Sequence, residues 1–324
     1  MMILKSIIML FGTAGIRGIY GKDITERLAF RISNVFVEDK LVIARDTRPS
    51  GLSLVRAVIA GACQNGAKII DLGIVPTPTL AYATIKHKCN GIMITASHNP
   101  EEYNGLKLFA SGKEIVKADE HKVEQKYLKN KLEYEDGTNN YVTESDPDIV
   151  KDHIQMITSQ VDIVAIRKKK FNVLVDCNGA ASVVSPYLLT SLGCKVTTLN
   201  CELVGFNRKS EPNSENLSDT IKIAKALGSE ITFAHDGDGD RCIVIDDKGE
   251  MLPFDVQLAI MIEYELSLCK NKGSRIITTV ESSLIVRDAI EKNGGKTIIT
   301  PVGSVYISEY LEKETALFGG EPCG

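Results

Sequence analysis

The sequence predicts an α/β protein made of tandem repeated α/β domains with mixed sheets. One observation is an internal repeat, in which a strand, an amphipathic helix and a second strand follow one another three times. Each repeated helix ends in Gly-x-Lys, beginning at Gly66, Gly193 and Gly294. Glycine ends helices and lysine suits the negative end of the helix dipole, so the match favours a common unit. The other observation is length, because 324 residues exceed one ordinary domain.

The first domain is expected to span residues 1–142. Its apolar beginning, residues 1–10, is interpreted as a buried edge strand, with Met9 as an alternative start. The further predicted elements are a helix over residues 25–38 and strands over residues 41–44, 68–72 and 92–95, with helices between the strands. Ser50 is expected to cap the helix that follows the strand at residues 41–44.

The second domain is expected to span residues 143–250 and the third residues 251–324. Asp146 and Pro147 are predicted to be the cap and the first residue of the helix that opens the second domain. The predicted strands of these two domains cover residues 170–175, 231–234, 275–280 and 316–318. A turn at residues 246–249 marks the passage from the second domain to the third.

The composition excludes several classes of partner. The net charge is −4, so no basic footprint indicates nucleic acid, and no apolar run reaches membrane-spanning length. The eight cysteines are scattered without a C-x-x-C pair, which argues against zinc ribbons and thioredoxin-like sites and favours free thiols in a reducing cytosol. We therefore expect a cytoplasmic protein that binds neither nucleic acid nor membranes. The sequence leaves the oligomeric state open.

Each domain carries an unusual loop directly after one of its strands. The loops are Ser-His-Asn-Pro at residues 97–100, His-Asp-Gly-Asp-Gly-Asp-Arg at residues 235–241 and Gly-Gly-Glu-Pro-Cys-Gly at residues 319–324. Ligands of α/β sheets gather at the carboxyl ends of the strands. Three equivalent strand ends that meet in one cleft would therefore bring these loops together.

Three aspartates, Asp236, Asp238 and Asp240, alternate with glycine in the second loop. Carboxylates this close repel one another unless a cation neutralises them, and the glycines let all three face one hard ion, Mg²⁺ or Ca²⁺. An EF-hand is rejected because Arg241 and Asp247 stand where that loop requires glycine and glutamate. A haloacid-dehalogenase-type phosphatase fits less well, and an acidic solvated turn is the plain alternative.

Ser97 follows a strand that ends on Asn-Pro, so it either closes the strand with a turn at the surface or acts as a nucleophile. A serine hydroxyl is a weak nucleophile, whereas a phosphorylated serine is a phosphoryl donor whose transfer needs charge neutralisation. Mg²⁺ with Arg17, Arg241 and Lys107 would supply that charge. Lys107 is expected in a turn at residues 104–107, and it could equally be an exposed lysine on a strand.

Five motifs, in order along the whole chain, resemble those of the α-D-phosphohexomutase family. They are Phe-Gly-Thr-Ala-Gly-Ile-Arg-Gly at residues 11–18, Thr-Ala-Ser-His-Asn-Pro at 95–100, Asn-Gly-Leu-Lys at 104–107, Asp-Gly-Asp-Gly-Asp-Arg at 236–241 and Gly-Glu-Pro-Cys-Gly at 320–324. The resemblance implies three-layer α/β/α domains. It also implies transfer of a phosphate between O6 and O1 of a hexose phosphate, through a bound hexose 1,6-bisphosphate that reorients.

The resemblance further implies a role for each residue of the site. The implied catalytic residues are Ser97, His98, Lys107 and Arg17, the implied ligands of one Mg²⁺ are Ser97, Asp236, Asp238 and Asp240, and the implied substrate-binding residues are Arg241, Glu321 and Cys323. Ser97 would be the phosphoserine, whose phosphate contributes an oxygen to the metal. Lys107 and His98 would assist proton transfer, and Glu321 would bind sugar hydroxyls.

Two departures from the family pattern bear on the substrate. Cys323 replaces the serine that is common in the sugar-binding loop, and a thiol donates a weaker hydrogen bond than a hydroxyl. Residues 301–304, Pro-Val-Gly-Ser, lack the histidine of the Thr-Gly-His-Ser loop of phosphomannomutase/phosphoglucomutase members and look more like phosphoglucosamine mutases and archaeal relatives. The resemblance therefore favours a phosphoglucosamine mutase, with phosphomannomutase/phosphoglucomutase as the alternative.

The members that this chain resembles continue past the third loop into a fourth, phosphate-binding domain. We therefore expect a fragment, apparently truncated before that domain, with turnover below that of full-length relatives. Two functions of other classes stay open at this point. One is a Mg²⁺-dependent phosphatase with Asp236 as nucleophile, and the other is a non-catalytic sugar-phosphate-binding fragment.

Overall fold

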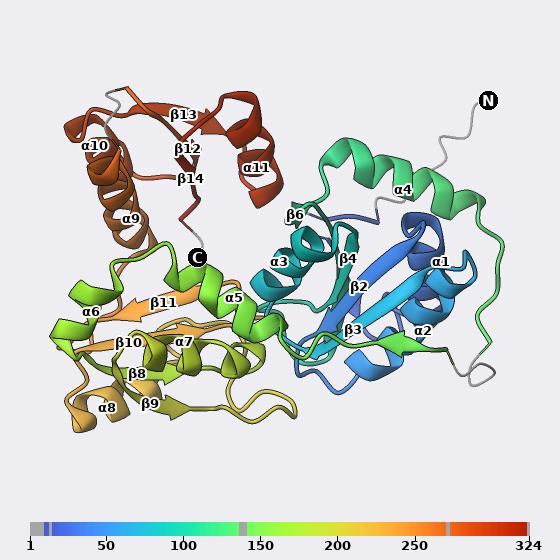
Figure 1. Cartoon of the computed structure of the whole chain (residues 1–324), viewed down its shortest axis with the longest axis horizontal. Helices are drawn as coiled ribbons and strands as arrows, with labels where there is room; N and C mark the ends of the chain where they lie inside the picture. The colour runs from blue at the N-terminus through green and yellow to red at the C-terminus, as the bar shows by residue number, and fades with distance from the viewer. Residues whose placement is uncertain (1–9, 13–14, 136–140, 270–272, 323–324) are drawn as a thin grey trace.

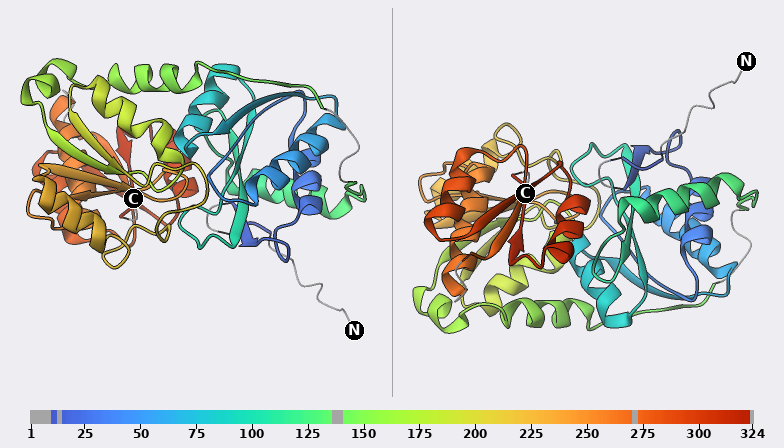
Figure 2. Two further views of the ribbon diagram at one scale, coloured as in Figure 1. Left: turned by 90° about the horizontal axis from the view of Figure 1, so that it is seen from below. Right: turned by 90° about the horizontal axis from the view of Figure 1, so that it is seen from above.

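The computed structural model describes residues 10–12, 15–135, 141–269 and 273–322. Its strands form three separate sheets, and helices lie against the faces of each sheet (Figure 1). The first sheet and its helices make up one side of the molecule, and the second and third sheets lie together on the other side (Figures 1 and 2). None of the helices in this described part has the length and apolar character needed to cross a membrane. The predicted strand at residues 1–10 lies, apart from Leu10, outside the described residues.

The first sheet is mixed and has seven strands in the order β1-β5-β4-β2-β3-β7, with β6 paired to β5. The strands are β1 (Ile16–Ile19), β2 (Lys40–Arg45), β3 (Lys68–Ile74), β4 (Asn90–Ile94), β5 (Tyr103–Ala110), β6 (Lys113–Glu114) and β7 (Thr143–Glu144). Strands β2, β3 and β4 are parallel, while β5 runs antiparallel to both β4 and β1. Because helices cover both faces, β2 and β4 are apolar and buried along nearly their whole length.

Helices pack on both faces of this sheet. They are α1 (Glu26–Phe36), α2 (Gly51–Cys63), α3 (Thr77–His87) and α4 (Lys117–Lys129). One core joins α1, α2 and α4 to the sheet and includes Leu54 and Val123, and a second core joins α3 to the sheet through Leu80. Successive residues of β2 alternate between the two cores, as the strand period requires. The domain therefore has the three layers expected of an α/β/α unit.

The second sheet has four strands in the order β11-β10-β8-β9, with β11 antiparallel to β10 and the other pairs parallel. The elements of this domain are α5 (Ile149–Thr158), α6 (Ile163–Lys169), β8 (Asn172–Asp176), the 3₁₀ helix η1 (Ala180–Val183), α7 (Ser185–Ser191), β9 (Lys195–Leu199), α8 (Ser218–Leu227), β10 (Ile231–His235) and β11 (Cys242–Ile245). Its core is again in two parts, one around Val173 and Val175 and the other around Leu217 and Ala234. The sheet is therefore also covered on both faces.

The third sheet has three parallel strands in the order β13-β12-β14. The elements of this domain are α9 (Phe254–Leu268), β12 (Arg275–Thr279), α10 (Leu284–Lys292), β13 (Lys296–Thr300), α11 (Ser304–Lys313) and β14 (Phe318–Gly319). Helices α9 and α10 pack together on one face through Ile262 and Ile290, and α11 lies on the other (Figure 1).

The three sheets confirm the predicted internal repeat. In each one, two strands joined by a helix are parallel neighbours, and a third parallel strand adds to the free edge of the first. The strands added in this way are β4, β10 and β14, whose carboxyl ends carry the loops at residues 97–100, 235–241 and 319–324. Tandem α/β/α domains are thereby confirmed, and the first two sheets are mixed.

One predicted helix cap is confirmed in position only, and the other is wrong. Ser50 is the N-cap residue of α2, but its side chain makes no capping hydrogen bond, and its Oγ instead accepts from Asn104 Nδ2 at 2.8 Å. Asp146 does not cap α5, which begins beyond it; its carboxylate instead pairs with Lys86 and His87 at the end of α3. In both cases the side chain bonds a residue that is distant in sequence, although local capping rules would place it on the amides at the start of the helix.

His153 on α5 links the first two domains through a contact that should be sensitive to acid. Its Nδ1 lies 2.9 Å from Thr79 Oγ1 on α3, and its ring stacks on Tyr82 with 5.3 Å between centroids. Burial lowers the pKa of His153 below its usual value. As the pH falls below about 6.5, the folded chain therefore binds fewer protons than the unfolded chain, so the free energy of unfolding should fall with it.

We expect His153→Phe to flatten this pH dependence, because phenylalanine keeps a ring on Tyr82 and cannot be protonated. Urea unfolding from about pH 7 to about pH 5 measures the effect. His121→Phe, which changes an exposed histidine of α4, is the control and should keep the parent slope. A His153→Phe slope equal to that of the parent would contradict the prediction.

Candidate active site

Ser97 lies where the first two domains meet, just beyond the end of β4. Its backbone is in the left-handed region, with φ at 51°, and the residue is only 2% exposed. Its amide donates to Thr95 Oγ1 at 2.8 Å, and its Oγ donates to Asp236 Oδ2 at 2.7 Å. The expected surface position is therefore wrong, because loops from two domains enclose this hydroxyl. A strained backbone of this kind is common at functional sites.

Arg48 fixes the Ser97 loop (residues 97–100) with one buried guanidinium. Its side chain is fully buried, and its Nε donates to Asp46 Oδ2 at 2.9 Å. The other donors bind main-chain oxygens of four residues in or beside the loop at 2.5–2.8 Å: Ser97, Asn99, Pro100 and Tyr103. Each of the five N–H donors thus has an acceptor. Sequence reasoning missed Arg48, and its place after β2, the strand beside β4, is the signal that could have found it.

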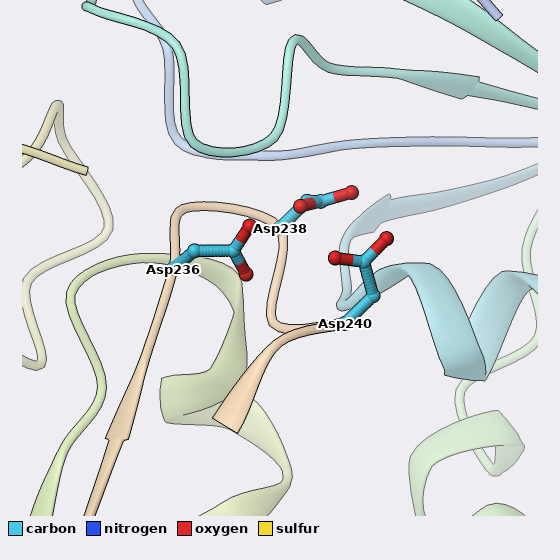
Figure 3. Close-up of side chains that lie close together, drawn as sticks. All are labelled: Asp236, Asp238 and Asp240. Atoms are coloured by element: carbon cyan, nitrogen blue, oxygen red, sulfur yellow. The ribbon is translucent and has the colours of Figure 1, made fainter. Parts of the chain in front are cut away.

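The predicted aspartate cluster forms on one tight loop after β10, the aspartate loop (residues 235–241). One carboxylate oxygen from each of Asp236, Asp238 and Asp240 lies within 4.8 Å of the others (Figure 3). Asp236 and Asp238 are fully buried, whereas Asp240 is exposed. Gly239 permits the turn because its φ is positive, at 68°. Three carboxylates are therefore held beside the Ser97 hydroxyl.

Lys107 offsets part of this negative charge. It lies inside β5, not in the predicted turn, and is 1% exposed. Its Nζ lies 2.8 Å from Asp238 Oδ2 and also binds Asp240 Oδ2. Burial opposes the charged form, but these carboxylates raise the pKa of Lys107 above its usual value. Burial likewise acts to raise the pKa of Asp238, but Lys107 and the hydroxyl of Thr77 outweigh it and hold that pKa well below its usual value.

The aspartate loop fits a divalent cation. Burial and the neighbouring carboxylates raise the pKa of Asp236 well above its usual value. Three carboxylates face the single ammonium of Lys107, which pairs with two of them. Asp238 Oδ1 is buried and has no hydrogen-bond partner among the described residues. A buried carboxylate oxygen without a partner needs a hydrogen-bond donor or a cation. Mg²⁺ and Ca²⁺ both prefer oxygen ligands, so either ion fits this position.

His98 lies beside Ser97, and Arg17 is close enough to His98 to lower its pKa. Arg17 lies on β1 opposite Gly105, where an added Cβ would come within 3.1 Å of Arg17 Cγ, so glycine leaves the side chain room. Arg17 Nε is buried and has no hydrogen-bond partner in the described part of the chain, so this donor is available to an anion. His98 Nδ1 lies 3.5 Å from Ser97 Oγ. Burial, followed by Arg241 and Arg17, lowers the pKa of His98 to about 4, so its ring is neutral near pH 7.

The third loop (residues 319–324, of which 319–322 are described) and the aspartate loop border one cavity of about 440 Å³ through Pro322 and Arg241. The lining residues are Glu211, Pro212, Asn213, Ser214, Arg241, Met251, Phe254 and Pro322. Arg241 ends the aspartate loop, and Pro322 belongs to the third loop. Glu321, beside it, accepts from the Gly303 amide at 2.9 Å. The structure thus brings Arg241 and the third loop to one cavity, while Cys323 lies outside the described residues.

Sequence profiles of one family match the chain in order. Residues 9–134 match "Phosphoglucomutase/phosphomannomutase, alpha/beta/alpha domain I", residues 151–249 match domain II and residues 253–324 match domain III. A probable phosphoglucosamine mutase of Methanosphaera stadtmanae is 40% identical, over 99% of this chain and 72% of that relative. A phosphoglucosamine mutase of Methanococcus maripaludis is also 40% identical, over 97% of this chain and 70% of that relative. A phosphoglucomutase/phosphomannomutase of Thermococcus kodakarensis is 38% identical, over 97% of this chain and 72% of that relative.

Solved structures of similar proteins share the arrangement of the three sheets. A phosphoglucomutase/phosphomannomutase family protein from Burkholderia thailandensis is 28% identical with a TM-score of 0.81, over 96% of this chain and 70% of that one. A putative phosphomannomutase from Thermus thermophilus is 24% identical with a TM-score of 0.84, over 97% of this chain and 74% of that one. The second likeness, at its lower identity, bears on the fold alone.

Proposed function

Because the chain belongs to the phosphoglucomutase/phosphomannomutase family, we propose that it is a phosphohexomutase that acts on glucosamine phosphate. The observation that carries the proposal is the contact between the Ser97 hydroxyl and Asp236, inside a cluster of three aspartates. The probable phosphoglucosamine mutase of M. stadtmanae and the phosphoglucosamine mutase of M. maripaludis, each 40% identical to this chain, favour glucosamine as the hexose. The alternative hexoses, glucose and mannose, are supported by the relative from T. kodakarensis.

The proposed reaction begins with a phosphate on Ser97 Oγ. Substrate O1 attacks phosphorus and loses its proton, the bond from phosphorus to Ser97 Oγ breaks, and Oγ regains a proton. The resulting hexose 1,6-bisphosphate reorients. Ser97 Oγ then loses its proton and attacks the phosphorus on O6, the bond from that phosphorus to O6 breaks, and O6 gains a proton to leave the 1-phosphate. Such transfers depend on positioning and charge stabilisation more than on covalent machinery, which suits a serine enclosed by cations and carboxylates.

Each neighbouring side chain has a proposed part. The unpartnered Nε of Arg17 would bind an oxygen of the transferring phosphoryl group. Lys107 would assist proton transfer as a fixed positive charge, because its raised pKa keeps the ammonium protonated, and His98, which is neutral near pH 7, can accept a proton. Glu321, which precedes Pro322 in the cavity lining, would accept from sugar hydroxyls, and Arg241, which lines the cavity, would bind the substrate phosphate. Cys323 would contribute only a weak hydrogen bond.

The metal ligands are also part of the proposal. Asp236, Asp238 and Asp240, with an oxygen of phosphorylated Ser97, would hold one Mg²⁺. The ion, when bound, would neutralise charge that develops on the transferring group. The orphaned Asp238 Oδ1 supports this assignment because it is a buried ligand atom without a partner in the described part of the chain.

We also propose the domain division 1–142, 143–250 and 251–324, and a cytoplasmic location. Six of the described cysteines, at positions 63, 89, 177, 194, 201 and 242, are free thiols, which supports a reducing compartment. Hexose 1,6-bisphosphate is the proposed activator, because it would place the first phosphate on Ser97.

A panel of glucosamine 6-phosphate, glucose 6-phosphate and mannose 6-phosphate tests the proposed function. Each assay contains Mg²⁺ and the matching 1,6-bisphosphate, and phosphorus NMR follows the 1-phosphate product. We expect glucosamine phosphate to give the highest kcat/KM. Incubation with the bisphosphate alone should add the mass of one phosphoryl group to the peptide that contains Ser97.

The other outcomes separate the alternatives. A higher kcat/KM for glucose or mannose phosphate would move the assignment to a phosphoglucomutase/phosphomannomutase. Net release of inorganic phosphate, with a phosphoryl group trapped on Asp236, would support a phosphatase. Binding of sugar phosphate without turnover, and without phosphate on Ser97, would support a non-catalytic protein.

A further inference from the structure

The connection between β9 and α8, residues 200–217, reaches from the second domain to the first. The Gly205 amide donates to the Thr47 carbonyl oxygen at 2.9 Å, and the Gly205 carbonyl oxygen accepts from Thr47 Oγ1 at 2.8 Å. The ring of Phe206 lies under the Arg48 guanidinium, 4.8 Å from centroid to Cζ. This connection is therefore held against the same arginine that fixes the Ser97 loop.

Ser210, on the same connection, joins the Ser97 loop to the aspartate loop. The residue is 2% exposed, and its Oγ donates to the Ser97 carbonyl oxygen at 2.8 Å. The same Oγ accepts from the amide of Gly237 at 2.9 Å, and Gly237 stands between Asp236 and Asp238. A hydroxyl can donate once and accept at the same time, and Ser210 uses both capacities. One side chain thus bridges the main chains of the two loops.

The space around this hydroxyl leaves the two loops little freedom. An added Cβ at Gly237 would lie 2.8 Å from Ser210 Oγ and 2.4 Å from the Phe206 ring, so the connection packs directly on the aspartate loop. On the other side, Thr77 Oγ1 donates to Asp238 Oδ2 at 2.6 Å, which ties the same loop to the first domain. A change of the bridge would therefore move the aspartates relative to Ser97.

We propose that Ser210 is a positioning residue that sets the aspartate loop for its divalent cation and holds Ser97 Oγ against it. The part that concerns transfer rests on the proposed function, whereas the part that concerns metal affinity does not. The Oγ of Ser210 contacts the main chains of Gly237 and Ser97, and Ser210 acts through them. Loss of a group that orients metal ligands typically weakens metal binding or activity by about 10- to 100-fold.

The test measures Mg²⁺ affinity of the full chain by calorimetry, with Ser97 unphosphorylated. We expect Ser210→Ala to weaken Mg²⁺ binding by about tenfold or more, and to slow phosphorylation of Ser97 by glucose 1,6-bisphosphate by a similar factor. Ser210→Thr keeps the hydroxyl and should recover most of the Mg²⁺ affinity and most of the rate of Ser97 phosphorylation. The control, Ser33→Ala, removes another fully buried hydroxyl, which donates to the Val58 carbonyl oxygen at 2.6 Å within the first domain. It should leave both quantities unchanged.

Several results would overturn the proposal. An Mg²⁺ affinity of Ser210→Ala within about twofold of the parent value would overturn it. An equal loss of Mg²⁺ affinity in Ser33→Ala would also overturn it, because that loss would indicate a general loss of rigidity. If Ser210→Ala unfolds, Ser210→Cys supplies the comparison, because a thiol keeps the shape and donates weakly, and it should give an intermediate affinity. A parent chain that takes up no phosphate would count against the mutase function, and the affinity comparison would still decide the role of Ser210.

Discussion

Replacing Ser97 by alanine is expected to abolish phosphoryl transfer, with a fall in kcat of at least about a thousandfold. The Ser97 hydroxyl is the group that would carry the phosphate, and a methyl group cannot form that bond. The variant also loses the 2.7 Å hydrogen bond from Ser97 Oγ to Asp236, so the two loops lose a direct contact. Phosphorus NMR measures turnover, and intact mass after incubation with the bisphosphate shows whether the chain still takes up phosphate.

The left-handed backbone at Ser97 makes a second variant necessary. Alanine is strained at a φ of 51°, whereas glycine adopts this conformation readily. Ser97→Gly should therefore be as inactive as Ser97→Ala but unfold at a higher temperature. Turnover above about a hundredth of the parent value in both variants would remove Ser97 from the reaction. Activity that persisted with a phosphoryl group on Asp236 would favour the phosphatase.

The sequence predicted the fold well where local pattern and tertiary structure agree. The apolar runs at residues 92–95 and 231–234 correspond to β4 and β10, because buried parallel strands are short and continuously apolar. The Gly-x-Lys signal also has a physical basis in the structure. Gly66, Gly193 and Gly294 have φ of 76°, 82° and 75°, a conformation that ends a helix without strain in glycine alone. The division into domains at residues 142 and 250 stays a prediction.

The candidate site was predicted less completely because its shape depends on contacts distant in sequence. The three aspartates were found because their charge density is local, within five residues. Arg48 and Ser210 bind the Ser97 carbonyl oxygen from 49 and 113 residues away. The position of Arg48 after β2 is a signal that could have found it, whereas nothing in the neighbourhood of Ser210 distinguishes it from a surface turn. Lys107 was expected in a turn because Asn-Gly is a turn signal, but pairing with β1 and β4 makes the segment a buried strand.

Lys107→Met is expected to lower the free energy of unfolding by about 3–5 kcal/mol in metal-free buffer. Lys107 is 1% exposed and Asp238 is fully buried, so the variant leaves a carboxylate without its charged partner. Methionine fills a similar volume, which keeps loss of packing small. Chemical denaturation measures the effect. Lys113→Met is the matched control on the neighbouring strand β6, and it should cost less than about 1 kcal/mol because its partner Glu312 is exposed.

Two additions distinguish an uncompensated charge from a packing defect in Lys107→Met. Mg²⁺ should restore part of the stability, because a cation that binds the folded chain and not the unfolded one stabilises it by mass action. Asp238→Asn in the same background should also restore stability, since the unpaired charge is gone, and it should abolish the response to Mg²⁺ because a ligand is lost. If neither Mg²⁺ nor Asp238→Asn restores stability, Lys107 does not balance the charge of the aspartate loop. The same conclusion follows if Lys107→Met and Lys113→Met lower the free energy of unfolding equally.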